Sequence, residues 1–501
     1  MSDPDAVAAY AAALALDAMN FEAWEGMARA LMARGAYAVA CDALVQALGL
    51  RPQAEEARCL LAEALFHLGE ADAASAAYQR VIARAEPALR DAALASLAVM
   101  IPGSAAASHE MVRAVRAAWI GRVGGAIQAM PTRAAPSGRR IRVGYLSAFF
   151  GERNWMRAAY GVINRHDRDR FDVYLIADGA EPSAEAGYVA QAGDRVLQAK
   201  GMANGALARA IAQAGLDVLV DLNGYALAGR LGLFPYRPAR LQLGWLGHSA
   251  TSGVPGIDAL VGDAMVIRPE EEDHYSERVL RVPGTCLAFE VAYPTPEVGP
   301  LPWLANGVPT LGCLGAGYKL TPQTLEAWAA ILRAVPAARL VVGHASLDDE
   351  GNRGELLRRL EGRGVAAARV TLSGAAAHFD FLGGYRAIDI ALDTWPTSGT
   401  ATTAEALWQG VPVLTVAGDR WASRTSASLL QAAGLSEWVA EDRDGFVAQA
   451  VALLSDPATA GWLVSLRAGM RQRLLASGAC DSAGLCRALE ALYTQGLEEH
   501  V

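Results

Sequence analysis

The sequence predicts an all-α region of helical repeats followed by two α/β domains, each built around a doubly wound parallel sheet. Three observations support this. A 34-residue period runs through residues 1–100, strand-like and helical segments alternate from residue 141 onward, and a proline-rich interruption near residue 295 is followed by a second alternation. With 501 residues, of which 53% are apolar, the chain is long enough for several cores.

The first 100 residues are rich in alanine and show no strand pattern. Gly35 recurs as Gly69, and Ala28 recurs as Ala62, each time 34 residues later. This is the tetratricopeptide period, which places small residues where paired helices touch and glycine at the turn between helices. Roughly two and a half repeats are present, so we expect a short groove that binds a peptide or caps the next domain.

Residues 101–138 are expected to connect the repeats to the α/β region, with a helix near 109–128 and prolines as breakers. Residues 139–295 are expected to form the first Rossmann-like domain. Its predicted strands are 141–146, 171–176, 217–221, 241–246 and 259–262, and its predicted helices are 153–164 and 203–214.

Residues 296–501 are expected to form the second Rossmann-like domain, ending in a C-terminal helix. Its predicted strands are 310–314, 340–342, 369–372, 388–392 and 412–415, and its predicted helices are 324–335, 354–361, 403–409 and 423–433. Two such domains joined by a proline hinge predict a cleft, with ligands at the carboxyl ends of the strands.

The most informative stretch runs from residue 389 to 415, where a turn rich in Gly, Ser and Thr separates a buried strand from a short helix. A helix N-terminus has free backbone N–H groups and a partial positive charge, so it favours phosphate. Gly399, Thr402 and Thr403 are the candidate ligands. Because no Gly-Lys-Ser/Thr signature accompanies them, we expect a nucleotide-linked donor rather than hydrolysis of a nucleoside triphosphate.

Composition excludes several other classes of function. The net charge is −9 without a basic block, which argues against nucleic acid as a partner. The six cysteines form no CxxC pair, and the N-terminus lacks a signal-peptide pattern, so cytoplasmic residence with reduced thiols is the default expectation. We expect no membrane partner and no metal site, because no apolar run spans a bilayer and the histidines do not cluster.

Four segments carry a resemblance to a known family. These are LQLGWLGHSATSGVPGIDAL (241–260), YSERVLRVP (275–283), GYKLTPQTLEAW (317–328) and TAEALWQGVPVLTVAGDRWASRTSASLL (403–430). They resemble the protein O-GlcNAc transferases and the related SPINDLY-type protein O-fucosyltransferases, over residues 139–500. The resemblance implies an inverting, metal-independent glycosyltransferase of the two-Rossmann (GT-B) fold, needing no cofactor besides its donor substrate.

On the donor side, the resemblance implies that Lys319 neutralises the leaving diphosphate. It also implies that Glu405 contacts ribose hydroxyls and that His378 stacks on the nucleotide base. Ala316 stands where family members often carry Asn or Gln, so one side-chain donor is missing.

In the first domain, small residues from Gly247 to Thr251 can bring backbone N–H groups close to the sugar or the diphosphate, so Gly247 and Thr251 are expected to bind the nucleotide sugar. His248 and Ser249 stand where the family usually has tyrosine and proline, and Ala250 replaces a glycine. The segment that begins at Asn223 resembles another acceptor-side loop of the family.

The start of the first domain departs most from the family. Phe149 stands at a position that is usually aspartate, and Arg153 lies near the position of a usual histidine. A base that serves the acceptor hydroxyl would then be Glu152, His248, Asp217 or the donor phosphate itself, and the sequence leaves these four open.

The resemblance suggests transfer of GlcNAc from UDP-GlcNAc to Ser or Thr of a protein or peptide. Three alternatives stay open: GDP-fucose or UDP-glucose as the donor, a non-protein acceptor, and a degenerate adaptor that binds nucleotide sugar without catalysis.

Overall fold

The computed structural model describes residues 4–123, 129–131 and 138–499. Packing within the chain divides it into two units. Unit 1 contains residues 1–107, 295–418 and 437–471, and unit 2 contains residues 108–294, 419–436 and 472–501.

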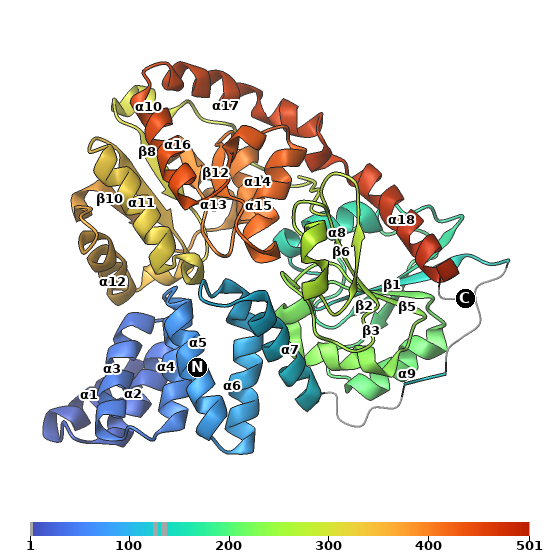
Figure 1. The fold of residues 1–501 in the computed structure, drawn as a ribbon, viewed down its shortest axis with the longest axis horizontal. Coiled ribbons are helices and arrows are strands. Elements are labelled where there is room, and N and C mark those ends of the chain that lie inside the picture. The colour runs from blue at the N-terminus through green and yellow to red at the C-terminus, as the bar shows by residue number, and fades with distance from the viewer. Residues whose placement is uncertain (1–3, 124–128, 132–137, 500–501) are drawn as a thin grey trace. The chain divides into compact units, whose positions relative to one another are not determined.

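Unit 1 begins with six consecutive helices, each of which packs against the next (Figure 1). They are α1 (Pro4–Leu16), α2 (Phe21–Ala33), α3 (Tyr37–Leu50), α4 (Glu55–His67), α5 (Ala71–Arg84) and α6 (Pro87–Met100). Gly35 and Gly69 follow α2 and α4 with φ of 75° and 84°, in the left-handed region that favours glycine. Ala28 and Ala62 are fully buried between helices. The helical repeats predicted from the 34-residue period are therefore present.

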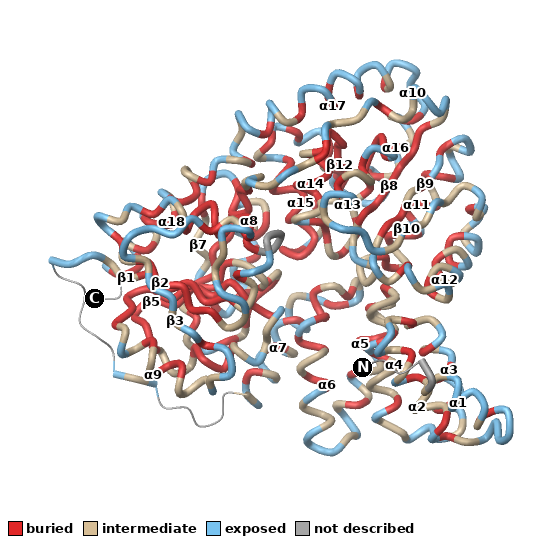
Figure 2. Tube along the Cα trace, turned by 180° about the vertical axis from the view of Figure 1, so that it is seen from behind, coloured by how far each residue is buried: buried red, intermediate tan, exposed pale blue. Residues whose placement is uncertain are grey.

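The rest of unit 1 is a six-stranded parallel sheet in the order β10-β9-β8-β11-β12-β13. The strands are β8 (Thr310–Cys313), β9 (Arg339–Gly343), β10 (Val370–Ser373), β11 (Ile390–Leu392), β12 (Val413–Val416) and β13 (Val439–Ala440). The helices are α10 (Pro302–Asn306), α11 (Pro322–Ala334), α12 (Glu350–Glu361), α13 (His378–Gly384), α14 (Ala401–Trp408), α16 (Arg443–Ser455) and α17 (Thr459–Leu475). Figure 2 shows that the central strands β8 and β12 are largely buried, as expected for a parallel sheet covered on both faces.

Unit 2 contains a seven-stranded parallel sheet in the order β3-β2-β1-β4-β5-β6-β7. The strands are β1 (Ile141–Ser147), β2 (Phe171–Ala177), β3 (Arg195–Gln198), β4 (Val218–Asp221), β5 (Leu241–Gly244), β6 (Ala259–Gly262) and β7 (Arg278–Arg281). The helices are α7 (His109–Val123), α8 (Arg153–Ile163), α9 (Asn204–Ala214), α15 (Trp421–Ala432) and α18 (Ser482–Glu499). Two Rossmann-like sheets preceded by helical repeats confirm the predicted fold class.

The division into units corrects the expected domain boundaries. We expected residues 296–501 to belong to one domain, but residues 419–436 and 472–499 pack with the first sheet. The contacts of α18 explain why. The Tyr493 hydroxyl lies 3.0 Å from the Tyr145 hydroxyl of β1, and Gly496 packs closely against Leu241 of β5. Of the expected connector, α7 belongs to unit 2, while residues 124–128 and 132–137 lie outside the described residues.

A search of the described helices for candidate bilayer spans finds no single helix of sufficient length and apolarity. One pair, Arg443–Ser455 with Thr459–Leu475, passes the length and composition test together but is bent by 103°.

Candidate functional site

Lys319 lies at the carboxyl end of β8, in a single 3₁₀ turn formed by Gly317–Lys319. Its Nζ donates a hydrogen bond of 2.7 Å to the carbonyl oxygen of Ser398, and the side chain is half-buried. Thr321 caps α11 directly afterwards by accepting from the Thr324 N–H. The predicted lysine and the predicted turn after β11 are thus in direct contact, 79 residues apart in the sequence.

The turn between β11 and α14 is organised by Asp393, which the sequence analysis did not single out. Its Oδ1 accepts the N–H groups of Thr394 at 2.9 Å and of Gly399 at 2.8 Å, and its Oδ2 accepts the Thr415 hydroxyl at 2.6 Å. An Asp side chain that accepts nearby backbone N–H groups is a standard way to close a tight turn. Asp393 directly follows a predicted apolar strand, and this position is the sequence feature that could have identified it.

Helix α11 fixes the same turn from a second direction. The hydroxyls of Thr321 and Thr324 donate to the Trp395 carbonyl at 2.6 and 2.8 Å, and the Trp328 indole N–H donates to the Asp393 carbonyl at 3.3 Å. Because Thr321 and Lys319 are two residues apart, one short segment supplies both the cation and the anchors of the turn.

Helix α14 begins at Ala401 without a side-chain cap, since the N-cap residue Thr400 makes no capping hydrogen bond. Gly399 is buried, Thr402 is half-buried and Thr403 is 3% exposed. The Tyr385 hydroxyl donates to the Thr402 carbonyl at 2.9 Å and holds the first turn of the helix. A helix N-terminus next to a lysine ammonium group provides the positive potential that binds phosphate.

The two residues expected to contact the nucleoside, Glu405 and His378, are also in contact. His378 Nε2 lies 2.9 Å from Glu405 Oε1, with the histidine side chain 26% exposed and the glutamate side chain 3% exposed. His378 begins α13, which follows β10, whereas Glu405 lies on α14. The structure therefore places the donor-side residues predicted in the second domain at the carboxyl edge of the second sheet, whereas Gly247 and Thr251, also predicted to bind the nucleotide sugar, belong to unit 2.

A pocket of about 460 Å³ lies beside the Lys319 turn and is lined jointly by the helical repeats and the second sheet. Its walls include Arg34, Tyr37, His67, Tyr318, His344 and Asp348. Tyr37 and His67 stack with ring centroids 4.2 Å apart. Burial lowers the pKa of His344 to about 4, so this imidazole is neutral near pH 7.

In unit 2, the loop after β5 contains the predicted residues Gly247, His248 and Thr251. Gly247 has φ of 75°, and a Cβ there would meet the Asn223 carbonyl oxygen at 2.3 Å. The close approach that this glycine permits is therefore to the segment after β4. The Thr251 hydroxyl, 3% exposed, lies 2.8 Å from Glu277 Oε2.

Glu277 and Arg116 hold this loop, and neither was predicted. Glu277 accepts the backbone N–H groups of Ser252 at 2.9 Å and Gly253 at 3.0 Å, and it also bonds the Ser252 and Ser276 hydroxyls. Arg116 of α7 is 1% exposed, and its Nη1 donates to the carbonyls of His248 at 2.9 Å and Thr251 at 2.7 Å. Arg116 and Glu277 are distant in sequence from the loop, so no local sequence pattern predicts their contacts with it.

His248 and Asn223 are completely buried at the carboxyl end of the first sheet. His248 Nε2 lies 3.2 Å from Asp221 Oδ2, although neither ring nitrogen has a well-aligned hydrogen-bond partner within the described part of the chain. Asn223 Oδ1 accepts the Ala148 N–H at 2.8 Å and links the segments after β1 and β4. These contacts make both side chains part of the packing beneath the loops.

The structure separates the other candidate bases. Glu152 is exposed and occupies the N-cap position of α8 without a side-chain capping hydrogen bond, after the carboxyl end of β1. Asp217, in contrast, precedes β4 and lies at the amino edge of the sheet, where it makes a two-point ion pair with Arg139 at 2.7 and 2.8 Å. Asp217 is therefore not brought together with the other candidates. The side chain of Arg153 lies outside the described residues.

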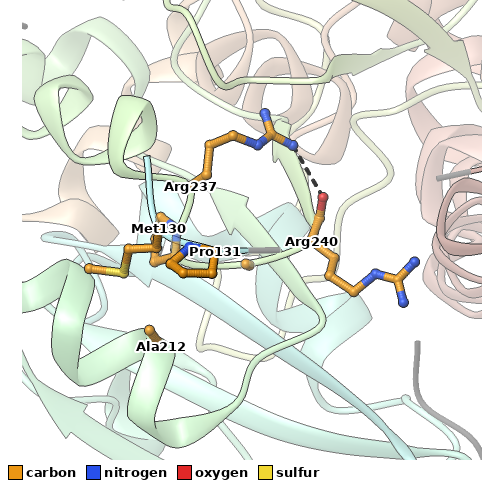
Figure 3. Close-up of a pocket in the computed structure, with 7 residues that line it drawn as sticks. Met130, Pro131, Ala212, Arg237 and Arg240 are labelled. Carbon is orange, nitrogen blue, oxygen red and sulfur yellow. Dashed lines mark hydrogen bonds between the residues drawn. The ribbon is translucent and has the colours of Figure 1, made fainter. Parts of the chain in front are cut away.

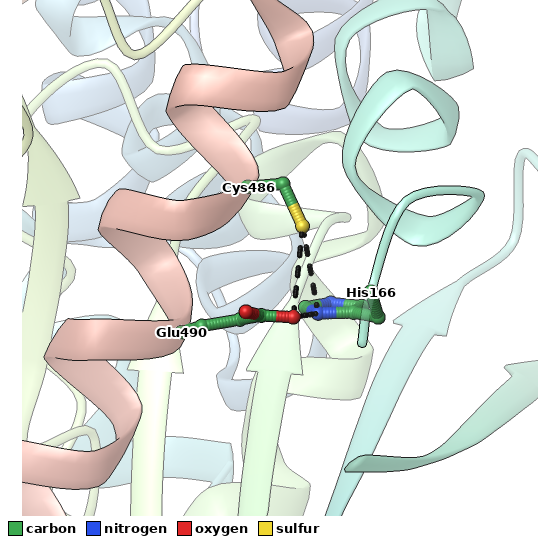
Figure 4. A group of neighbouring side chains, drawn as sticks. All are labelled: His166, Cys486 and Glu490. Carbon is green, nitrogen blue, oxygen red and sulfur yellow. Dashed lines mark hydrogen bonds and ion pairs between the residues drawn. The ribbon is translucent and has the colours of Figure 1, made fainter. Parts of the chain in front are cut away.

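A buried group of three residues has the chemistry of metal ligands: His166, Cys486 and Glu490 (Figure 4). Its polar atoms already pair with each other and with neighbours. His166 Nδ1 lies 2.9 Å from Glu490 Oε1, and its Nε2 lies 2.6 Å from the Tyr145 hydroxyl. Burial lowers the pKa of His166. We interpret this group as a hydrogen-bonded attachment of α18 to the first sheet.

A second small pocket lies in unit 2 near Arg237 and Arg240 (Figure 3). Its volume of about 40 Å³ holds little more than a water molecule, so it is too small for a nucleotide.

Parallel α/β sheets with a lysine and a helix N-terminus at one carboxyl edge are an arrangement that suits phosphate-containing ligands. A family model described as glycosyl transferase family 41 matches residues 122–290 and 313–487. These ranges make up more than half of the chain, and the chain belongs to glycosyl transferase family 41. The predicted enzyme class, a glycosyltransferase, is thereby confirmed.

Individual relatives agree with this assignment. Over 282 residues the chain is 36% identical to a Solanum lycopersicum protein named probable UDP-N-acetylglucosamine–peptide N-acetylglucosaminyltransferase SPINDLY, a match that covers 56% of this chain and 30% of the relative. The Arabidopsis thaliana protein of the same name is 31% identical over 366 residues, covering 71% of this chain and 39% of the relative. The chain thus spans well under half the length of these plant relatives.

A solved structure of a mutant O-GlcNAc transferase from Thermobaculum terrenum has a TM-score of 0.83 to this chain at 29% identity. The likeness covers 99% of this chain and 95% of the other. It extends from the helical repeats through both sheets and confirms the predicted architecture.

Proposed function

We propose that this chain transfers a sugar from a nucleotide-diphosphate donor, UDP-GlcNAc in the first instance, to Ser or Thr hydroxyls of a protein. The observation that carries the proposal is the contact between Lys319 Nζ and the Ser398 carbonyl in the turn that leads into α14. This contact brings an ammonium group next to the N-terminus of α14. Both favour a diphosphate, which is the leaving group of such a transfer.

In the proposed reaction, the acceptor hydroxyl attacks the anomeric carbon on the face opposite the diphosphate. A new carbon–oxygen bond forms while the bond to the β-phosphate oxygen breaks, so the configuration inverts. The bonding electron pair leaves with the diphosphate, where Lys319 and the backbone N–H groups at the start of α14 stabilise the added charge. Stabilisation that grows as the bond breaks lowers the barrier itself.

The hydroxyl proton needs an acceptor. Glu152 is exposed at the carboxyl edge of the first sheet, whereas His248 is fully buried and Asp217 lies at the opposite edge in an ion pair. We therefore propose Glu152 or an oxygen of the donor α-phosphate as the base. Glu152→Gln distinguishes them: kcat falls by about 100-fold or more if Glu152 is the base and stays unchanged if the phosphate takes the proton.

For the nucleoside, we propose that Glu405 accepts hydrogen bonds from the ribose hydroxyls and that the His378 ring packs on the base. Their mutual contact at 2.9 Å fixes the orientation of both side chains. The reaction as proposed uses no metal, because the lysine and the helix supply the positive charge. Activity should therefore persist in the presence of EDTA.

Two kinds of similarity support the protein acceptor. The plant relatives are named as peptide N-acetylglucosaminyltransferases, and the solved structure is named an O-GlcNAc transferase. In this chain, the pocket beside the Lys319 turn is lined partly by the helical repeats, which gives a polypeptide a surface next to the proposed site of reaction.

The test is incubation with UDP-GlcNAc, UDP-glucose and GDP-fucose, each with a Ser/Thr peptide library, followed by mass spectrometry. The proposal expects a product shifted by one N-acetylhexosamine, and products from the other donors would revise the donor. The chain has two lysines, Lys200 and Lys319, and Lys200 is exposed after β3. Lys319→Met should lose at least about 100-fold in kcat, and Lys200→Met is the matched control. Absence of both transfer and donor hydrolysis with all three donors would refute the enzyme activity.

A further inference from the structure

We propose that the end of α4 together with the turn into α5, residues 66–70 of the helical repeats, positions Lys319 for the reaction. The inference rests on the role proposed above for Lys319 and goes beyond it, because it gives the repeats a part in catalysis in addition to acceptor binding. We call residues 66–70 the repeat turn and residues 317–320 the lysine turn.

The backbones of the two turns lie against each other at Gly69. This residue has φ of 84°, and a Cβ placed on it would lie 2.4 Å from the Leu320 carbonyl oxygen and 3.2 Å from that of Gly317. Real Cβ atoms do not approach backbone atoms so closely, so only glycine allows this packing. Both ends of the lysine turn are thus in contact with the repeat turn at Gly69.

Side chains extend the contact on either side. The Phe66 ring stacks on the Tyr318 ring with centroids 5.1 Å apart and an interplanar angle of 25°. Tyr318 directly precedes Lys319, whose Nζ lies 6.0 Å from the centroid of the same ring. Movement of the Phe66 ring would therefore be passed to the residue next to the ammonium group.

Arg359 of α12 joins the two turns by hydrogen bonds. Its Nη1 donates to the Leu68 carbonyl at 2.5 Å, and its Nη2 donates to the Leu320 carbonyl at 3.2 Å. Nη2 also lies 2.8 Å from Glu70 Oε1, and the arginine side chain is 7% exposed. A planar guanidinium group with several fixed donors suits such a bridge better than an ammonium group.

The lysine turn is therefore held on one side by the repeat turn and on the other by the bond from Lys319 Nζ to Ser398. Three residues of 3₁₀ helix have little rigidity of their own. The external contacts must then fix where the ammonium group lies. A displacement of about 1 Å at a reacting group can lower a rate by about 100-fold.

The chain contains a matched control in the preceding repeat. Gly35 occupies the equivalent turn with φ of 75°, yet a Cβ there would meet only the Tyr37 ring at 3.9 Å. Gly35→Ala and Gly69→Ala therefore introduce a similar backbone strain, but Gly69→Ala alone pushes on the lysine turn.

The test compares the two variants by labelling and by kinetics. An amine-reactive reagent followed by peptide mapping reports the reactivity of Lys319 against Lys200 as an internal reference. We expect Gly69→Ala to raise the relative labelling of Lys319 several-fold and to lower kcat at least tenfold with little change in acceptor KM. We expect Gly35→Ala to change neither quantity. Phe66→Leu provides a second, milder variant that should shift both in the same direction.

Equal Lys319 labelling in wild type, Gly69→Ala and Phe66→Leu would overturn the inference, as would equal kcat in the two alanine variants. Labelling does not depend on turnover, so it tests the positioning even if wild type transfers no sugar. In that case the proposed function fails, and the labelling result alone decides whether the repeat turn positions Lys319.

Discussion

Asp393 provides a direct test of how the candidate site is built. The carboxylate accepts two backbone N–H groups, from Thr394 and Gly399, together with the Thr415 hydroxyl. A hydrogen bond to a charged acceptor contributes about 1.5–3 kcal/mol. Because Asp393 is half-buried, water can accept some of the hydrogen bonds that the three donors lose on mutation. We expect Asp393→Ala to lower the free energy of unfolding by about 3–5 kcal/mol.

In a thermal unfolding experiment this loss corresponds to a melting temperature lower by about 6–10 °C for a unit of this size. Two milder variants form a series. Thr415→Val removes one hydrogen bond and should cost about 1.5–3 kcal/mol, and Asp393→Asn should fall between the two because one acceptor oxygen is retained. The same order should appear in the loss of UDP affinity by calorimetry, since the turn leads into α14. A melting temperature of the Asp393→Ala variant equal to that of wild type would refute the view that this carboxylate closes the turn.

Three further predictions concern other parts of the chain. Glu277→Ala should destabilise unit 2 by about 3–5 kcal/mol, because it leaves the N–H groups of buried Ser252 and half-buried Gly253 without this acceptor. A melting temperature within about 1 °C of wild type would contradict this. Arg116→Met should cost about 2–4 kcal/mol through two buried carbonyls that lose their donor, as denaturant titration can measure. His344 takes up its proton near pH 6.5 in the unfolded chain but near pH 4 in the folded chain, so stability should fall by up to about 3 kcal/mol as the pH decreases through that window. The fall should be shallower in His344→Gln, and identical pH profiles would rule His344 out as the cause.

Apart from the edge strand β10, the strands that the sequence predicted correctly lie in the interior of the two sheets. The three that it missed, β3, β7 and β13, are all at sheet edges. β3 and β7 are four residues long, carry arginine and are largely exposed or half-buried. An edge strand pairs with only one neighbouring strand and is partly exposed to solvent, so it needs fewer apolar residues. It therefore lacks the apolar run by which a buried strand is recognised.

Domain membership was predictable only where the chain stays within one sheet. The proline-rich segment near residue 295 lies at a change of unit. The return of residues 472–499 to the first sheet was not foreseen, because it depends on contacts such as that between Tyr493 and Tyr145. Such contacts join residues more than 300 positions apart, and apolar periodicity in a helix does not identify the surface that it covers.

The candidate donor site was more accessible to sequence reasoning than the acceptor side. Lys319 and the turn before α14 follow strands that lie next to each other in the sheet, and the rule that ligands gather at carboxyl ends brings them together. Asp217 shows the limit of the same rule. It adjoins β4 but precedes it, so the direction of the strand places it at the opposite edge. The supporting residues Glu277, Arg116 and Arg359 act through contacts that only the folded chain reveals.

The most direct test of the central claim is a crystal structure with UDP or GDP bound. We predict that the diphosphate contacts Lys319 Nζ and the backbone N–H groups at the start of α14, with the ribose at Glu405 and the base beside His378. The nucleotide that binds more tightly then identifies the donor class. A diphosphate bound elsewhere, with Lys319 still donating to Ser398 and no ligand at the start of α14, would contradict the proposed donor site.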